Sequence, residues 1–185
     1  TTILNAACTQ NLLGTFAVGA TSITQGVNLQ TNAVPQGIAW TLDNASVLIT
    51  LGVTGTTVKR VTVPGGAITT IMNTSSSFGV AMVPGGLEAL VASGGSDTIK
   101  RISLTSNTVT GSINFESNSQ IHNIAVTPDG KTAIVAGSFN TGILDLTGAG
   151  AVKKSYGVGG NNVAITPDGK RGLVTLGSTM RVYPL

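Results

Sequence analysis

Short apolar runs alternate with turn-forming residues along most of the 185-residue chain. In the clearest unit, an apolar run at residues 122–127 leads into Pro128-Asp129-Gly130, and a second apolar run follows at 132–136. Proline presets φ for a turn, aspartate can accept a hydrogen bond from the backbone ahead, and glycine tolerates positive φ. The pattern therefore predicts a β-hairpin of two short strands.

This hairpin recurs about every 40 residues, which is the period expected for blades of four strands. The four copies share an alanine in the first strand and are Ile38–Ala45, Val80–Leu87, Ile124–Lys131 and Val163–Lys170. Third strands are predicted at 58–63, 99–104, 143–146 and 181–183, and fourth strands at 67–71, 108–113 and 151–156. The repeat predicts an all-β fold, a β-propeller with four-stranded blades.

Five blades with incomplete end blades fit this frame best. Residues 1–36 give a partial first blade with strands at 2–7, 13–18 and 22–28, and 161–185 give a partial last blade. Full blades are predicted at 37–76, 77–119 and 120–160. The two partial blades do not complement each other in an obvious way. A four-bladed ring with extra N-terminal strands, a fragment of a larger propeller and a gap filled by a partner chain all remain open, and a parallel β-helix is the rival fold.

The segments Ile124–Gly137 and Val163–Gly177 resemble the YVTN-type β-propeller repeat. That repeat reads as a strand, a Pro-Asp-Gly-Lys turn, a second strand and a third strand ending near an aspartate. Asp145 matches this aspartate, whereas Thr62, Ser103 and Tyr183 are aligned with it as departures. The resemblance covers 37–185 well and 1–36 poorly. It implies a propeller of the kind found in surface-layer and cell-surface proteins, in periplasmic binding proteins and in lactonase-like enzymes.

Composition narrows the function classes. Charged residues make up 9% and aromatic residues 4% of the chain, and the net charge of +3 comes from 10 basic and 7 acidic residues. Nucleic-acid binding usually needs a dense basic face interleaved with aromatic rings, so no nucleic-acid partner is expected. No apolar run is long enough to predict a transmembrane helix. The wealth of Thr, Ser, Asn and Gly favours an extracellular or cell-surface location, with the periplasm as a further option.

Few side chains could carry chemistry. Asp43, Asp129 and Asp168 lie in the repeated turn, where the prediction is that they cap the backbone rather than catalyse. His122 is the only histidine and Cys8 the only cysteine, which is either a buried thiol or a link between chains. Such a set predicts no metal site and no cofactor. Residues just before the first strand of each blade are predicted at the mouth of the central channel: Gln36, Ser77, Gln120, His122, Asn161 and Asn162.

Two basic pairs, Lys59-Arg60 and Lys100-Arg101, occupy equivalent places on the third strand. Arg181 is aligned with both arginines, and Ile143 interrupts the series. Adjacent strand residues point to opposite faces, so one member of each pair is expected between blades or toward a neighbouring carboxylate. The other reading is an arc of positive charge that holds an acidic glycan or another subunit.

These observations favour a non-catalytic interaction or structural module that binds a protein partner or a glycan, or assembles with itself through open strand edges. The candidate interaction residues are His122, Lys59, Arg60, Lys100, Arg101 and Arg181. The alternative is a lactonase-like or other hydrolase, which needs His122 or Asp97 at the channel mouth together with a metal.

Overall fold

The computed structural model describes residues 2–7, 12–18, 23–30, 34–52, 57–63, 66–73, 76 and 78–185, with side chains described from residue 34 onward. Cys8 and Ser77 lie outside the described residues, so the predictions made for them are not addressed.

Eighteen strands in the described residues form five antiparallel sheets, each built from consecutive strands. Blade 1 contains β1 (Thr2–Ala7), β2 (Leu12–Val18) and β3 (Ile23–Gln30). Blade 2 contains β4 (Val34–Trp40), β5 (Ser46–Gly52), β6 (Thr57–Thr62) and β7 (Ile68–Asn73). Blade 3 contains β8 (Val80–Val83), β9 (Glu88–Ser93), β10 (Thr98–Ser103) and β11 (Thr108–Asn114). Blade 4 contains β12 (Ile121–Val126), β13 (Thr132–Gly137), β14 (Thr141–Asp145) and β15 (Ala151–Tyr156), and blade 5 contains β16 (Asn162–Ile165), β17 (Arg171–Leu176) and β18 (Thr179–Pro184).

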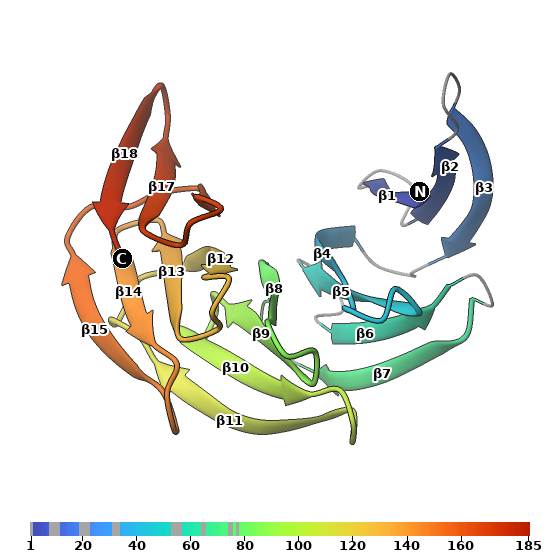
Figure 1. Cartoon of the computed structure of the whole chain (residues 1–185), viewed down its shortest axis with the longest axis horizontal. Coiled ribbons are helices and arrows are strands. Elements are labelled where there is room, and N and C mark those ends of the chain that lie inside the picture. Colours follow the sequence, from blue (N-terminus) through green and yellow to red (C-terminus); the bar gives the residue numbers. More distant parts are fainter. Residues whose placement is uncertain are drawn as a thin grey trace.

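The blades are arranged side by side around a common centre, with β7, β11 and β15 on the outer rim (Figure 1). The first strands β4, β8, β12 and β16 lie next to one another on the inside. The protein is a β-propeller of five blades with incomplete end blades, as predicted. Blades 1 and 5 stand at the two ends of an open arc (Figure 1). Because β1–β3 form a sheet of their own, the alternative of a four-bladed ring with extra N-terminal strands is wrong.

Strand register confirms the predicted repeat and corrects one alignment. Ala39, Ala81, Ala125 and Ala164 all lie on inner strands and pair with Leu48, Leu90, Ile134 and Leu173, respectively. Leu90 also pairs with Arg101, whereas Leu173 pairs with Val182. Arg181 pairs with Val174, as Lys100 pairs with Val91, so Arg181 occupies the lysine position and not the arginine position.

The same shift changes the residue at the aspartate position of the repeat. Asp145 pairs with Thr132, and the equivalent Arg171 pairs with Pro184. Pro184, not Tyr183, therefore stands there in blade 5. The error arose because β18 carries no sequence signal that fixes its register by itself.

The hydrophobic core is a series of layers between neighbouring blades. Leu90 and Ile99 of blade 3 pack with Ile124 and Val135 of blade 4, and each of these four side chains is at most 3% exposed. In blade 5, the position equivalent to Ile99 is Met180, which is 60% exposed. Burying such apolar area is the main stabilising term in a fold without helices or disulfide bonds among the described residues.

Three of the four repeated turns are closed by a threonine and an aspartate, which confirms the predicted capping role. The Thr127 hydroxyl donates to the Asp129 carboxylate at 2.6 Å and accepts from the Thr132 backbone N–H at 3.1 Å. The Asp129 carboxylate also accepts from the Lys131 backbone N–H at 3.0 Å. Blades 2 and 5 repeat this arrangement with Asp43 and Asp168.

These hydrogen bonds favour the ionised carboxylate. The neighbouring threonine hydroxyl, and after it the backbone N–H, lower the pKa of Asp43, Asp129 and Asp168 below the ordinary value. Blade 3 instead turns through Gly85 and Gly86, both at positive φ. No described segment is a helix of the length and hydrophobicity needed to cross a membrane.

Candidate functional site

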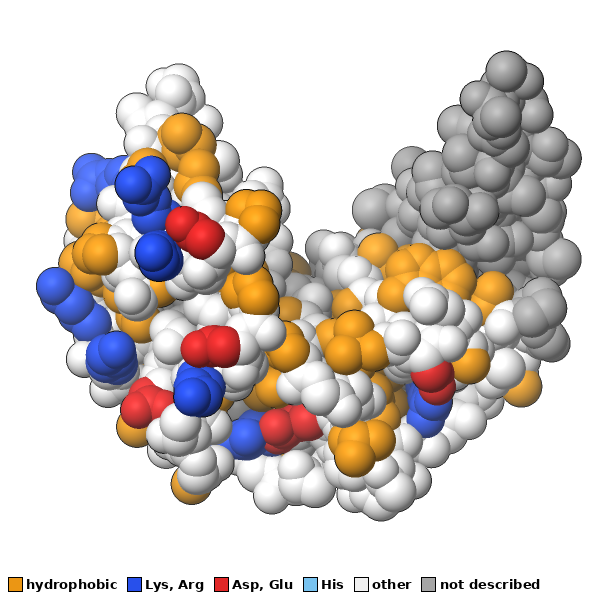
Figure 2. Space-filling view, viewed as in Figure 1, with side chains coloured by type: hydrophobic (Ala, Val, Ile, Leu, Met, Phe, Trp, Pro, Cys, Tyr) orange, Lys and Arg blue, Asp and Glu red, His pale blue; other side chains and the backbone are white. Residues whose placement is uncertain are grey.

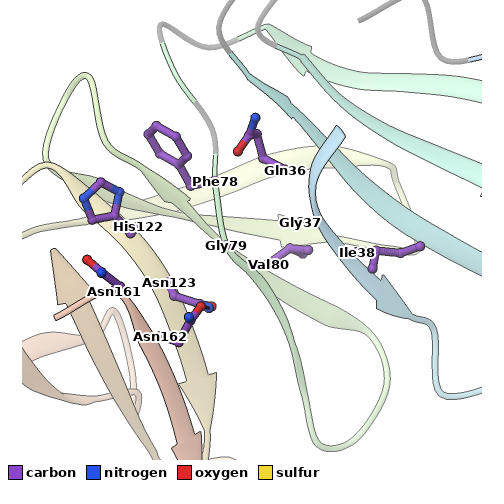
Figure 3. A pocket seen from close by; sticks show the side chains of 10 residues that line it. All are labelled: Gln36, Gly37, Ile38, Phe78, Gly79, Val80, His122, Asn123, Asn161 and Asn162. Atoms are coloured by element: carbon purple, nitrogen blue, oxygen red, sulfur yellow. Dashed lines mark hydrogen bonds between the residues drawn. The ribbon is translucent and has the colours of Figure 1, made fainter. Parts of the chain in front are cut away.

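A pocket of about 480 Å³ opens where the inner strands of blades 2 to 5 begin (Figure 3). Its walls come from equivalent positions of four successive blades: Gln36, Gly37, Ile38, Phe78, Gly79, Val80, His122, Asn123, Asn161 and Asn162. This volume lies in the range of small-molecule sites, about 300–1,000 Å³.

Glycines bring the inner strands close together at the base of this pocket. A Cβ on Gly79 would lie 2.7 Å from the Cα of Asn123, and one on Gly37 would overlap the carbonyl oxygen of Phe78. Blades 4 and 5 carry Asn123 and Asn162 at the same position. The repeat therefore places amide side chains on one side of the pocket and bare backbone on the other.

The amides on the blade 4 and blade 5 side are partly connected. Asn123 Nδ2 donates to Asn162 Oδ1 at 3.2 Å, and Asn123 Oδ1 accepts from the Ile124 backbone N–H at 2.8 Å. The side-chain amides of Gln36 and Asn161 have no hydrogen-bond partner in the part of the chain that the structure describes. Both are exposed. The pocket thus presents unused donors and acceptors of both kinds.

Phe78 and His122 form the aromatic part of the wall. Their ring centroids lie 5.4 Å apart in an edge-to-face arrangement. His122 Nε2 lies 2.7 Å from Ser138 Oγ, and Ser138 donates to Gln120 Oε1 at 3.1 Å. Because the hydroxyl has one hydrogen, it accepts from Nε2–H of His122. Both rings also line a smaller cavity of about 220 Å³ that includes Gln120.

Four of the six residues predicted at the channel mouth therefore line this pocket: Gln36, His122, Asn161 and Asn162. Gln120 lines the smaller neighbouring cavity, and Ser77 lies outside the described residues. Sequence reasoning missed Phe78 and Asn123. Phe78 occupies the same repeat position as Gln36 and His122, so extending the alignment by two residues before the shared alanine would have found it.

The basic pairs lie away from the pocket, and their arginines join neighbouring blades. Arg60 of blade 2 donates to the Leu104 carbonyl of blade 3 at 2.9 Å. Arg101 of blade 3 donates to the Gly148 carbonyl of blade 4 at 2.7 Å and makes a bidentate ion pair with Glu88. The predicted contact between blades is confirmed for both arginines. Lys59 and Lys100 are half-buried on the same strands, and Arg181 is exposed on blade 5.

The ion pair also affects proton binding. Hydrogen bonding to Glu88 raises the pKa of Arg101 further above its already high ordinary value. The Arg101 side chain is 16% exposed and the Glu88 side chain 25% exposed. This pair is therefore partly shielded from solvent and holds the guanidinium in place for its contact with blade 4.

Catalytic chemistry finds little support around His122. Asp97, the acid considered for a hydrolase, accepts from the Gln120 backbone N–H at 2.8 Å and does not line the pocket. The described residues contain no group of three or more His, Cys, Asp or Glu side chains arranged to hold a metal ion. The His122–Ser138 contact has no carboxylate partner among the described residues that would orient the imidazole as in a catalytic triad.

Comparisons with known proteins support the fold. The chain is similar to hydrazine synthase from Kuenenia stuttgartiensis, with 22% identity and a TM-score of 0.71, over 81% of this chain and 46% of that one. It is also similar to a functionally unknown protein from Desulfotomaculum acetoxidans DSM 771, with 16% identity and a TM-score of 0.86, over 99% of this chain and 62% of that one. The chain thus spans less than two thirds of either protein. No protein-family model and no curated protein matches it.

Proposed function

We propose that this propeller is a non-catalytic binding module that holds a neutral glycan in the pocket formed by blades 2 to 5. The observation that carries the proposal is the lining of that pocket. Four amide side chains surround it, Phe78 adds an apolar ring, and no Asp, Glu, Lys or Arg lies among its residues. A site of this composition favours an uncharged, polar ligand.

Sugars match this site because each hydroxyl group can both donate and accept a hydrogen bond, as each side-chain amide can. Gln36 and Asn161 stand on opposite sides of the pocket and keep their amides free of bonds to other described residues (Figure 3). The ring of Phe78 offers an apolar face to the C–H groups of a sugar. A glycan that spans the pocket would contact blades 2 and 5 at once.

An extracellular or cell-surface setting completes the proposal. The repeats resemble the YVTN-type propellers of surface proteins, and the low charge content of 9% agrees with that class. The enzymatic name of one structural neighbour does not enter, because likeness at 22% identity supports the fold alone.

Affinity electrophoresis in gels that contain neutral polysaccharides (dextran, mannan, galactan or soluble chitin oligomers) tests this function. At least one should retard the protein. The double substitution Gln36→Ala and Asn161→Ala should weaken that binding about tenfold, since each lost hydrogen bond contributes roughly 0.5–1.5 kcal/mol. Both side chains are exposed, so the fold should survive.

The matched control is Asn114→Ala, which removes an exposed amide at the end of β11, away from the pocket residues. It should bind as the unmodified protein does. The proposal fails if no neutral polysaccharide retards the protein, or if the control loses as much binding as the double variant.

A further inference from the structure

A second hollow, of about 310 Å³, lies between blades 4 and 5, away from the glycan pocket. Its lining combines two lysines with an aromatic and an aliphatic surface: Ile143, Lys153, Lys154, Tyr156, Pro184 and Leu185. We call it the lysine groove. It has the opposite character to the first pocket, whose lining holds no charged side chain.

A β-bulge places both lysines on this groove. Ile143 pairs with Lys154 and Leu144 pairs with Val152, which leaves Lys153 as the extra residue of β15. In a regular strand, two neighbouring side chains would point to opposite faces. A bulge redirects one of them, so Lys153 and Lys154 both reach the groove.

The groove replaces the arginine contact found at the junction of blades 3 and 4. There, Arg101 fills the space between blades and reaches the carbonyl oxygens of Leu146 and Gly148. Ile143 stands at the equivalent position of blade 4, opposite Ile134 as Arg101 is opposite Leu90. An isoleucine cannot donate to the next blade, so the basic groups at this junction come from the outer strand instead.

Aromatic packing holds one of these lysines. The ring of Tyr156 packs against Tyr183 with centroids 4.6 Å apart, and Lys154 Nζ lies 5.0 Å from the Tyr156 ring centroid. A cation–π contact of this kind limits the freedom of the lysine but leaves its three N–H donors able to bind an anion.

The surrounding surface is the positive part of the protein. Residues 120–185 contain six of the 10 basic residues and three of the 7 acidic ones, so they account for the whole net charge of +3. All six are exposed: Lys131, Lys153, Lys154, Lys170, Arg171 and Arg181. Figure 2 shows Lys and Arg side chains gathered over blades 4 and 5. The only salt bridge among the described residues is Arg101–Glu88, so none of the six is paired in this way.

The three acids nearby are held in turns. The Asp145 carboxylate accepts from the hydroxyl and backbone N–H of Thr147, at 2.6 and 2.8 Å. Asp129 and Asp168 are bound by the threonines of their own turns. These acids are interleaved with the lysines and reduce the local potential, which suits a polymer with widely spaced charges better than a continuous phosphate backbone.

We propose that the lysine groove binds a carboxylate- or sulfate-bearing sugar of an acidic polysaccharide. Lys153 and Lys154 pair with the anionic group, Ile143 and Tyr156 contact the apolar side of the sugar ring, and the other exposed basic residues attract the polymer. The one aromatic ring in the groove is already packed against Tyr183, so it offers no stacking platform for nucleic-acid bases. This site is separate from the neutral-glycan pocket and selects for charge.

Binding to polygalacturonate and to chondroitin sulfate, with dextran as the uncharged comparison, tests the proposal. Isothermal titration at low salt should show binding to at least one acidic polymer, weakened by added salt. The double substitution Lys153→Gln and Lys154→Gln should weaken it about tenfold or more. Tyr156→Leu keeps every charge and should still reduce affinity.

The control is Lys131→Gln with Lys170→Gln, which removes the same charge from the turns of blades 4 and 5. It should lose less than about threefold, because only general attraction is affected. Equal losses in the two double variants, equal binding to dextran, or tighter binding to an acidic peptide or an oligonucleotide would overturn the proposal. Gln36→Ala with Asn161→Ala should leave acidic binding intact, so the two sites can fail separately.

Discussion

Blades 2 and 3 and blades 4 and 5 share one repeat but use their basic side chains in opposite ways. All four basic residues of 34–119 are half-buried, and they are balanced by four acids. All six in 120–185 are exposed and exceed the acids there by the full net charge. In the first region, arginine joins blades. In the second, lysine is available to an outside partner.

One repeat position carries much of this difference. Arg60 and Arg101 occupy it in blades 2 and 3, and Ile143 and Val182 in blades 4 and 5. A guanidinium there satisfies backbone carbonyls of the next blade, whereas an aliphatic side chain leaves an apolar floor. The scaffold tolerates both because the main-chain pairing and the neighbouring buried layers do not change.

The largest expected difference between the regions concerns the equivalent residues Leu90 and Leu173. Leu90 is fully buried between blades 3 and 4, so Leu90→Ala should lower the free energy of unfolding by about 2–5 kcal/mol. Leu173 is partly exposed on blade 5, and Leu173→Ala should cost well under half as much. Urea unfolding followed by circular dichroism measures both.

The same pair of variants detects self-assembly through blade 5. If a second copy covers this face, the cost of Leu173→Ala will rise with protein concentration, because association stabilises the folded state by mass action. A cost equal to that of Leu90→Ala at every concentration would contradict the assignment of Leu173 to an open face.

A smaller effect is expected for the turns, where blades 2, 4 and 5 use aspartate and blade 3 uses glycine. The lowered pKa of Asp129 means that its ionised form favours the folded state. This contribution is complete above the unfolded pKa of an aspartate, about 3.9, and is lost as the pH falls through the lower folded value.

Asp129→Ala should therefore destabilise the protein at neutral pH, and the difference from the unmodified protein should shrink in strong acid. Unfolding midpoints measured between neutral pH and about pH 2 would show the trend. Glu116→Ala, which removes an exposed acid outside the turns, is the comparison and should show no such convergence. A constant cost of Asp129→Ala at every pH would argue against the capping role.

Local sequence signals predicted the fold because each Pro-Asp-Gly hairpin encodes its own turn and its two strands. Register along β18 was harder, since Met180–Tyr183 alternates without a glycine or proline to mark a face, and Arg181 was placed one residue off. The arginines of β6 and β10 were predicted correctly because a charged residue on a buried strand needs a partner.

The two sites were only partly predictable. Gln36, His122, Asn161 and Asn162 follow from position in the repeat, but the contribution of Phe78 depends on how blades curve around the pocket. The lysine groove could not be read from the sequence at all. In a regular strand, Lys153 and Lys154 would diverge, and only the bulge opposite Leu144 brings them together.

The most direct test of this division of labour is the unfolding free energy of two charge-matched variants, Arg101→Gln and Lys154→Gln. Each removes one positive charge from the third or fourth strand of a blade. Arg101→Gln should cost about 1–3 kcal/mol, because Glu88 and two carbonyl groups of blade 4 lose a charged donor, whereas Lys154→Gln should change stability by less than about 0.5 kcal/mol. Equal losses of stability in the two variants would contradict the account.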